Sequence, residues 1–184
     1  YNSISNDERI RAVYTKAGIV DAFTTEKIII GENIKKLAKM PLTHQPGEKW
    51  TYGLNTDVIG YLVEVLSGQP LDQFLKARLF DPLGMNDTYF YLPTSKHNRL
   101  ATLYTEDSTK TLRVMKAQRG ISPDYPKTTN GTYFSGGAGL SSSMQDYAIF
   151  LQMMLNGGEY NGKRILSPMT VNLILSNQIG DLFV

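Results

Sequence analysis

Apolar residues at helical spacing recur along this chain in short runs, and a glycine or a proline ends most of them. The pattern predicts a series of short helices, because proline breaks a helix interior and glycine favours the left-handed residue that follows a helix. Pro70 and Pro168 fall where the first turn of a helix accepts proline. Ser142 with Gln145 is typical of a capping box. The predicted helices cover residues 8–16, 24–39, 56–67, 70–81, 142–156 and 167–175.

The apolar spacing also predicts which face of each helix lies inside the protein. Residues recurring at three and four positions lie on one side of a helix, and such a stripe normally faces the core. On the predicted helix 56–67 the stripe consists of Val58, Leu62, Val65 and Leu66. On the predicted helix 142–156 it consists of Met144, Tyr147, Leu151, Met154 and Leu155.

The middle of the chain follows a different pattern. Residues 101–105 and 111–117 alternate in polarity and are separated by a polar stretch, which predicts a β-hairpin. Residues 119–134 contain few aliphatic side chains and two prolines, so we expect an ordered loop that wraps another surface. The fold class predicted from these elements is mainly α with a small β-hairpin, in a single domain over residues 1–184.

Composition excludes several classes of function. The chain has 184 residues, a net charge of +2, two histidines and no cysteine. The small net charge gives no indication of nucleic-acid binding, and the lack of cysteine excludes disulfides, thiolate metal sites and a cysteine nucleophile. His44 and His97 are too few for a metal site, so no metal is expected. No apolar run approaches the ~20 residues that a membrane span requires.

Residues 46–60 carry the most informative local motif, PGEKWTYGLNTDVIG. A Pro-Gly turn leads into an alternating stretch, and Asn55 or Thr56 can cap a helix that starts near Asp57. This places Tyr52 close to a helix N-terminus, where positive potential favours a phenolate and suits a tyrosine to accept a proton. The alternative is that Tyr52 is a buried aromatic with a satisfied hydroxyl.

Further motifs follow in a fixed order. They read FDPLGMNDT at 80–88, SGGAGLSSS at 135–143, NGG at 156–158 and LSP at 166–168. Together with the tyrosine motif, this series resembles the serine β-lactamase-like family, which includes class C β-lactamases, DD-peptidases and carboxylesterases. The resemblance implies acyl transfer to a serine followed by hydrolysis, without a cofactor. It also implies a fold of two regions, a sheet with flanking helices and a helical region, with the active site between them.

The nucleophile motif of that family, S-x-x-K, is missing here, because no serine is followed three positions later by lysine. A K-T-G element is also missing. In the family these motifs lie before and after the stretch that this chain resembles. We therefore expect the chain to be the helical region of a larger serine hydrolase, lacking the α/β sheet region and inactive alone. The missing sheet region is then its expected partner, self-association through the uncovered face is possible, and the family favours a periplasmic or extracellular location.

The resemblance also assigns candidate site residues. Tyr52 occupies the place of the catalytic tyrosine, which exchanges a proton with the serine or the leaving group. Many family members have a Y-x-N motif whose asparagine holds an amide. Here the third residue is Leu54 and Asn55 follows, and both are candidate substrate-binding residues. This departure favours ester or small-amide substrates over β-lactams. Phe134 and Ser135 are expected to border the substrate, and the glycines after Ser135 to permit close backbone approach.

Two hypotheses of other classes remain open at this point. The chain can be a non-catalytic module that binds a partner through the surface a sheet would otherwise cover. It can also be a sugar- or peptide-binding domain without chemistry. The absence of S-x-x-K is compatible with both of these hypotheses and with the helical region of a larger hydrolase. A small acyl substrate is the ligand expected under the hydrolase interpretation.

Overall fold

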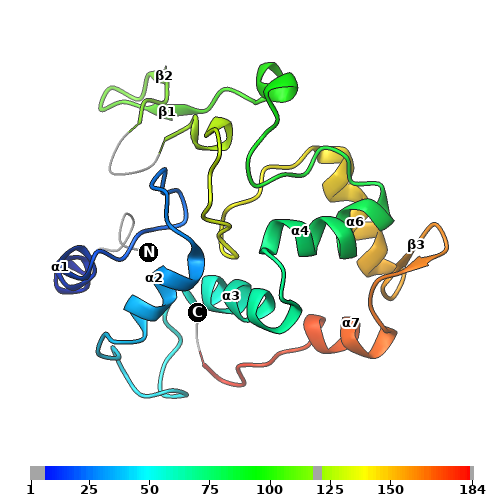
Figure 1. The fold of residues 1–184 in the computed structure, drawn as a ribbon, viewed down its shortest axis with the longest axis horizontal. Coiled ribbons are helices and arrows are strands. Elements are labelled where there is room, and N and C mark those ends of the chain that lie inside the picture. The colour runs from blue at the N-terminus through cyan, green and yellow to red at the C-terminus, as the bar shows by residue number, and fades with distance from the viewer. Residues whose placement is uncertain (1–6, 118–121, 183–184) are drawn as a thin grey trace.

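The computed structural model describes residues 7–117 and 122–182 of the chain. Figure 1 shows α1 and α2 on one side, α6 and α7 on the other, and α3 and α4 between them. The helices are α1 Glu8–Ala17, α2 Ile30–Leu37, α3 Asn55–Ser67, α4 Leu71–Leu75, α5 Asp81–Leu83, α6 Met144–Leu155 and α7 Pro168–Leu175. A π-helical segment, Lys76–Phe80, joins α4 to α5, and 3₁₀ turns cover Thr94–Arg99 and Tyr125–Lys127.

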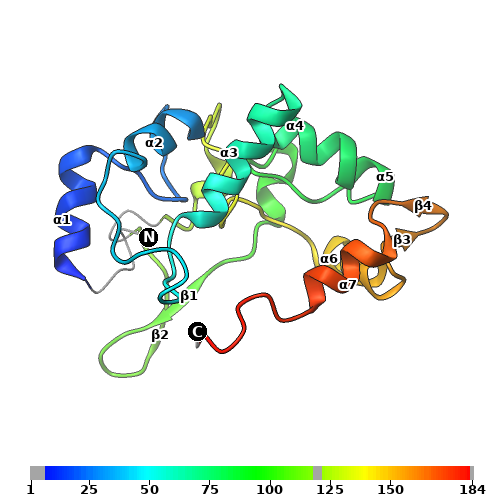
Figure 2. The same ribbon diagram turned by 90° about the horizontal axis from the view of Figure 1, so that it is seen from below.

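The strands of the described residues form two small antiparallel hairpins. β1 Tyr104–Glu106 pairs with β2 Leu112–Val114, and this hairpin extends away from the helices in both ribbon views (Figures 1 and 2). β3 Glu159–Tyr160 pairs with β4 Lys163–Arg164. The prediction of a mainly α fold with a small hairpin is confirmed for these residues, whereas the second hairpin was not predicted. Residues 119–121 of the predicted loop lie outside the described residues.

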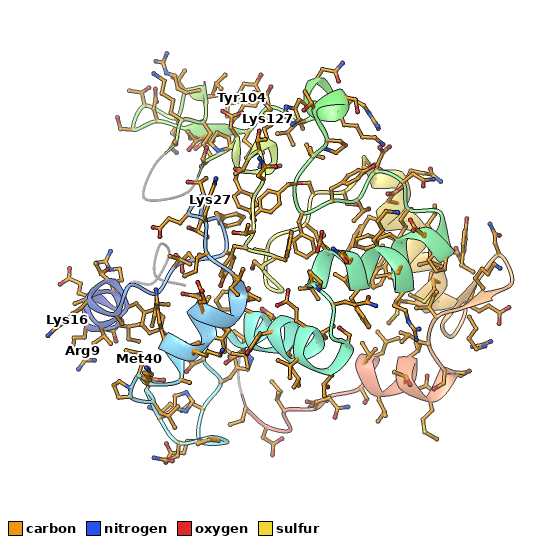
Figure 3. The ribbon with its side chains drawn as sticks, in the orientation of Figure 1. Arg9, Lys16, Lys27, Met40, Tyr104 and Lys127 are labelled. Carbon is orange, nitrogen blue, oxygen red and sulfur yellow. The ribbon has the colours of Figure 1, made fainter. Side chains whose placement is uncertain are left out.

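Side-chain caps define several helix starts. The Asp7 carboxylate accepts a hydrogen bond of 2.9 Å from the Arg9 N–H at the start of α1. Figure 3 shows Arg9 and Lys16 of α1 pointing away from the other helices. α6 begins one residue later than the predicted capping box, because Ser143 rather than Ser142 accepts from the Asp146 N–H at 3.1 Å. The helix predicted from residue 24 begins at Ile30.

Two apolar clusters form the core. The first joins α2 to a distant segment, because Ile30 and Ile34 pack with the fully buried Tyr133. The Tyr133 hydroxyl also accepts a 2.8 Å hydrogen bond from the buried side-chain amide of Asn33, 100 residues away in sequence. The second cluster joins the π-helical segment and α5 to α6 and contains Phe80, Leu83, Met85 and Met153.

The predicted inner faces of α3 and α6 are wrong for most of their residues. On α3, Val58, Leu62, Val65 and Leu66 are exposed, and on α6 Met144, Tyr147, Leu151 and Leu155 are exposed. The residue that α6 buries completely is Met153. The spacing identified an apolar stripe on each helix correctly, but a stripe does not specify what covers it. α7 likewise exposes Met169, Leu173, Ile174 and Leu175.

Candidate active site

The tyrosine loop leads directly into α3. Tyr52 is 58% exposed, and its ring lies 6.0 Å, centroid to centroid, from the ring of Trp50. Its hydroxyl therefore belongs to an exposed side chain rather than to a core aromatic, and the buried alternative is wrong for this chain. Next to it, the His44 ring contacts the Thr51 hydroxyl at 2.7 Å.

The start of α3 differs from the sequence expectation. The N-cap position is Leu54, which forms no side-chain cap, and Asn55 is the first helical residue. Because Leu54 is buried and Asn55 is exposed, they lie in different environments although both were predicted to bind substrate. The placement favours Asn55 for contact with a ligand, while a substrate role for Leu54 remains a prediction that its burial does not support.

A buried carboxylate lies in the first turn of α3. Asp57 is fully buried, and its Oδ1 accepts a 2.6 Å hydrogen bond from the Ser135 hydroxyl. Burial raises the pKa of Asp57, while the Ser135 hydroxyl and the backbone N–H groups of Gly137 and Gly136 act in the opposite direction. Among the described residues, Oδ2 of Asp57 has no hydrogen-bond partner of acceptable geometry. The sequence places Asp57 near a helix start, but it does not predict that the carboxylate is buried.

The Ser135 hydroxyl forms three hydrogen bonds at the start of the glycine-rich loop 135–139. It accepts from the backbone N–H groups of Gly137 and Ala138, both at 3.2 Å, while donating to Asp57. The side chain is only 2% exposed. Its predicted contact with substrate therefore stays a prediction, and the hydrogen bonds indicate that Ser135 positions the loop against α3.

Close backbone contact explains the glycine at position 136. A Cβ there would lie 2.3 Å from the Thr56 carbonyl oxygen and 3.3 Å from the Gly60 Cα. No side chain fits at such distances, so the expected close approach is confirmed at this position. The same loop thus touches the helix that begins three residues after Tyr52.

Phe134 faces a different part of the molecule. Its half-buried ring packs edge-on against Phe90 at 5.3 Å and lies 6.0 Å from Tyr91. It lines a cavity with residues of α4 and of the π-helical segment. The predicted site residues therefore divide into an exposed pair, Tyr52 and Asn55, a buried pair, Leu54 and Ser135, and Phe134 at this cavity.

Residues 7–117 and 122–182 contain no group of three or more His, Cys, Asp or Glu side chains arranged to hold a metal ion. No helix in the same ranges is long and apolar enough to cross a membrane.

Comparison with known proteins places the chain in a family. A sequence model of the Beta-lactamase family matches residues 11–178. Esterase EstB of Burkholderia gladioli is 32% identical over 148 residues, covering 73% of this chain and 36% of the esterase. A putative D-alanyl-D-alanine carboxypeptidase of Escherichia coli O157:H7 is 29% identical over 160 residues, covering 82% of this chain and 37% of that protein.

The fold supports the same grouping. The structure of EstCE1, a hydrolase with promiscuous acyltransferase activity, matches with a TM-score of 0.72 at 27% identity, covering 87% of this chain and 43% of that one. The chain spans about a third of the length of the curated relatives it matches. Because the family match extends over most of the sequence, this chain belongs to the beta-lactamase family of serine hydrolases.

Proposed function

We propose that this chain contributes the proton-carrying tyrosine, Tyr52, to a serine hydrolase that works through an acyl-serine intermediate. The observation that carries the proposal is the exposed side chain of Tyr52 in the loop before α3 of a beta-lactamase family chain. The nucleophilic serine and its lysine neighbour come from a further region of the same protein, since no S-x-x-K occurs here. The tyrosine passes a proton between that serine and the leaving group.

Acyl esters are the proposed substrates. Leu54 stands where an amide-holding asparagine would complete Y-x-N, and a buried leucine offers a substrate no polar group. The likeness to an esterase and to a hydrolase with acyltransferase activity supports the same choice. β-Lactams and peptides, which present an amide beside the reactive carbonyl, are expected to react more slowly.

The exposed apolar stripes support the proposal of a covering region. α3, α6 and α7 together expose more than ten large apolar side chains, and patches of this kind normally mark a contact surface. We propose that the sheet region of the same protein covers them. The second candidate function, a non-catalytic interaction module, rests on the same stripes and on the missing nucleophile, and differs in predicting no hydrolysis by any longer form.

Substitution of Tyr52 tests the proposal in the full-length protein. Tyr52→Phe keeps the ring and removes the hydroxyl, so kcat/KM for a p-nitrophenyl ester should fall about 10²–10⁴-fold. The matched control is Tyr104→Phe, because Tyr104 is similarly exposed on the β1–β2 hairpin. The 184-residue chain alone should hydrolyse neither that ester nor nitrocefin above buffer. Equal activity of the wild type and Tyr52→Phe, with both folded, would disprove the assignment of Tyr52.

A further inference from the structure

A cavity of about 270 Å³ lies between the α4–π-helix segment and two distant stretches, residues 85–91 and 130–134. The cavity is large enough for a small organic molecule. Tyr52 does not line it, whereas Phe134, one of the predicted substrate-binding residues, does.

Aromatic rings form much of the cavity wall. Phe80, Phe90, Tyr91 and Phe134 line it, and the Phe134 ring lies within 5.3 to 6.0 Å of the rings of Phe90 and Tyr91. The faces of such rings carry negative electrostatic potential and attract cations. Tyr91 is held in place because its hydroxyl donates a 2.8 Å hydrogen bond to the Tyr133 carbonyl oxygen.

A carboxylate without an ion-pair partner among the described residues, Asp72, lies in the same wall. Oδ1 of Asp72 is buried and forms no hydrogen bond of acceptable geometry among the described residues, and no ion pair to Asp72 is present among them. Burial raises the pKa of Asp72, and the neighbouring N–H groups of Gln73 and Asp72 itself offset this only in part. A buried acceptor without a partner is rare enough in folded proteins to need a reason.

Lys76 does not neutralise Asp72, although the backbone between them is regular helix, with the Lys76 N–H bonded to the Asp72 carbonyl oxygen. Lys76 follows Asp72 by four residues, the spacing at which oppositely charged side chains pair on a regular helix. The Lys76 ammonium instead pairs with Asp81, five residues further on, at the end of the segment whose backbone bonds also span five residues. Because Lys76 pairs with Asp81, the Asp72 carboxylate has no cationic partner among the described residues. π-Helical turns occur frequently at functional sites.

We propose that this cavity binds a small organic ammonium ion, with the Asp72 carboxylate as its counter-ion and the rings of Phe80, Phe90, Tyr91 and Phe134 around its alkyl groups. A metal ion fits this wall poorly, because hard cations prefer several oxygen ligands and the wall is largely aromatic. An anion would be repelled both by the carboxylate and by the negative potential of the ring faces.

Choline and its neutral carbon analogue, 3,3-dimethylbutan-1-ol, are the probes that test the proposal on the 184-residue chain. Choline should shift the backbone amide resonances of Asn130 and Gly131, which line the cavity, in a saturable way. The neutral analogue has nearly the same shape and should bind at least tenfold more weakly. Equal binding of the two probes, or no saturable shift with choline, would overturn the proposal.

Variants separate the counter-ion from general effects of charge. Asp72→Asn keeps the size of the side chain and should weaken choline binding at least tenfold. Asp124→Asn removes a negative charge from a surface pair with Lys127 and should leave binding unchanged. Lys76→Gln leaves Asp81 unneutralised and should tighten binding. Amide spectra report whether each variant is folded, and wild-type affinity in folded Asp72→Asn would contradict the proposal.

Discussion

Ser135 donates a 2.6 Å hydrogen bond from its hydroxyl to the buried carboxylate of Asp57, a residue 78 positions earlier in the chain. Asp57 belongs to the first turn of α3, and Tyr52 lies in the loop just before that turn. The bond therefore ties the glycine-rich loop to the base of the tyrosine loop. The pair is a positioning device, since neither side chain is exposed.

Removal of the Ser135 hydroxyl should destabilise the protein. Ser135→Ala leaves Oδ1 of Asp57 buried without a partner, which typically reduces the free energy of unfolding by about 1–3 kcal/mol. Urea unfolding at pH 7 measures the change. Ser95→Ala, at an exposed position, is the control and should lie within about 0.5 kcal/mol of the wild type. An unchanged midpoint for Ser135→Ala would show that the bond contributes little.

The buried carboxylate predicts a pH dependence of stability. Burial raises the pKa of Asp57 above its ordinary 3.8, so the folded chain holds that proton more tightly than the unfolded chain. The contribution of Asp57 to the free energy of unfolding is then full below pH 3.8 and is lost as pH rises through the raised pKa. Asp57→Asn does not titrate, so wild type should lose stability relative to this variant as pH rises. Urea unfolding of both proteins from pH 4 to 8 measures the difference, and a difference that is constant or grows in favour of the wild type would contradict the expectation.

Gly136→Ala should disrupt the contact between the loop and α3. Its Cβ would lie 2.3 Å from the Thr56 carbonyl oxygen, a backbone atom that moves only with the helix. We expect a loss of about 1–3 kcal/mol in the free energy of unfolding, the usual result of overpacking. Gly53→Ala is the matched control, since the nearest atom to its Cβ lies at 4.0 Å. Equal stability of the two variants would be evidence against a tight contact.

Leu54→Asn should reveal the core role of that position. Leu54 is buried at the start of α3, so an asparagine loses apolar burial and brings an amide into the interior. We expect a decrease of about 2–5 kcal/mol in the free energy of unfolding, by analogy with large-to-small core changes. Leu54→Met keeps the volume and should cost under about 1.5 kcal/mol. Thermal and urea unfolding measure both, and a stable Leu54→Asn protein would indicate that the side chain is not held in the core.

Local signals predicted much of the secondary structure. The helix expected at 8–16 is α1, Pro168 lies in the first turn of α7 as predicted, and the β1–β2 hairpin overlaps the expected ranges, with Glu106 of β1 one residue beyond them. Capping residues, glycine and proline act on neighbours within a few positions, which is why a single sequence reveals them. Tyr52 is exposed, and its part in a catalytic site stays a prediction.

Contacts between distant segments were not predictable in this way. Nothing near Asp57 in the sequence indicates that its carboxylate is buried, or that a serine 78 residues later donates a hydrogen bond to it. The π-helical turn at Lys76–Phe80 has no local signature either, and it places Asp81, the partner of Lys76, one turn beyond that lysine. The apolar stripe on α3 was recognised, but its exposure depends on what lies opposite, which spacing alone does not encode.

The hydrogen bond from Asn33 to Tyr133 has a consequence for synthesis of the protein. The apolar cluster around α2 is completed by a tyrosine that is translated 100 residues later. At ribosomal rates of about 5–20 residues per second, roughly 5–20 seconds separate the synthesis of Ile30 and Ile34 from that of Tyr133. During this interval the cluster around α2 lacks its Tyr133 ring, so this part of the core is complete only after the middle of the chain has been translated.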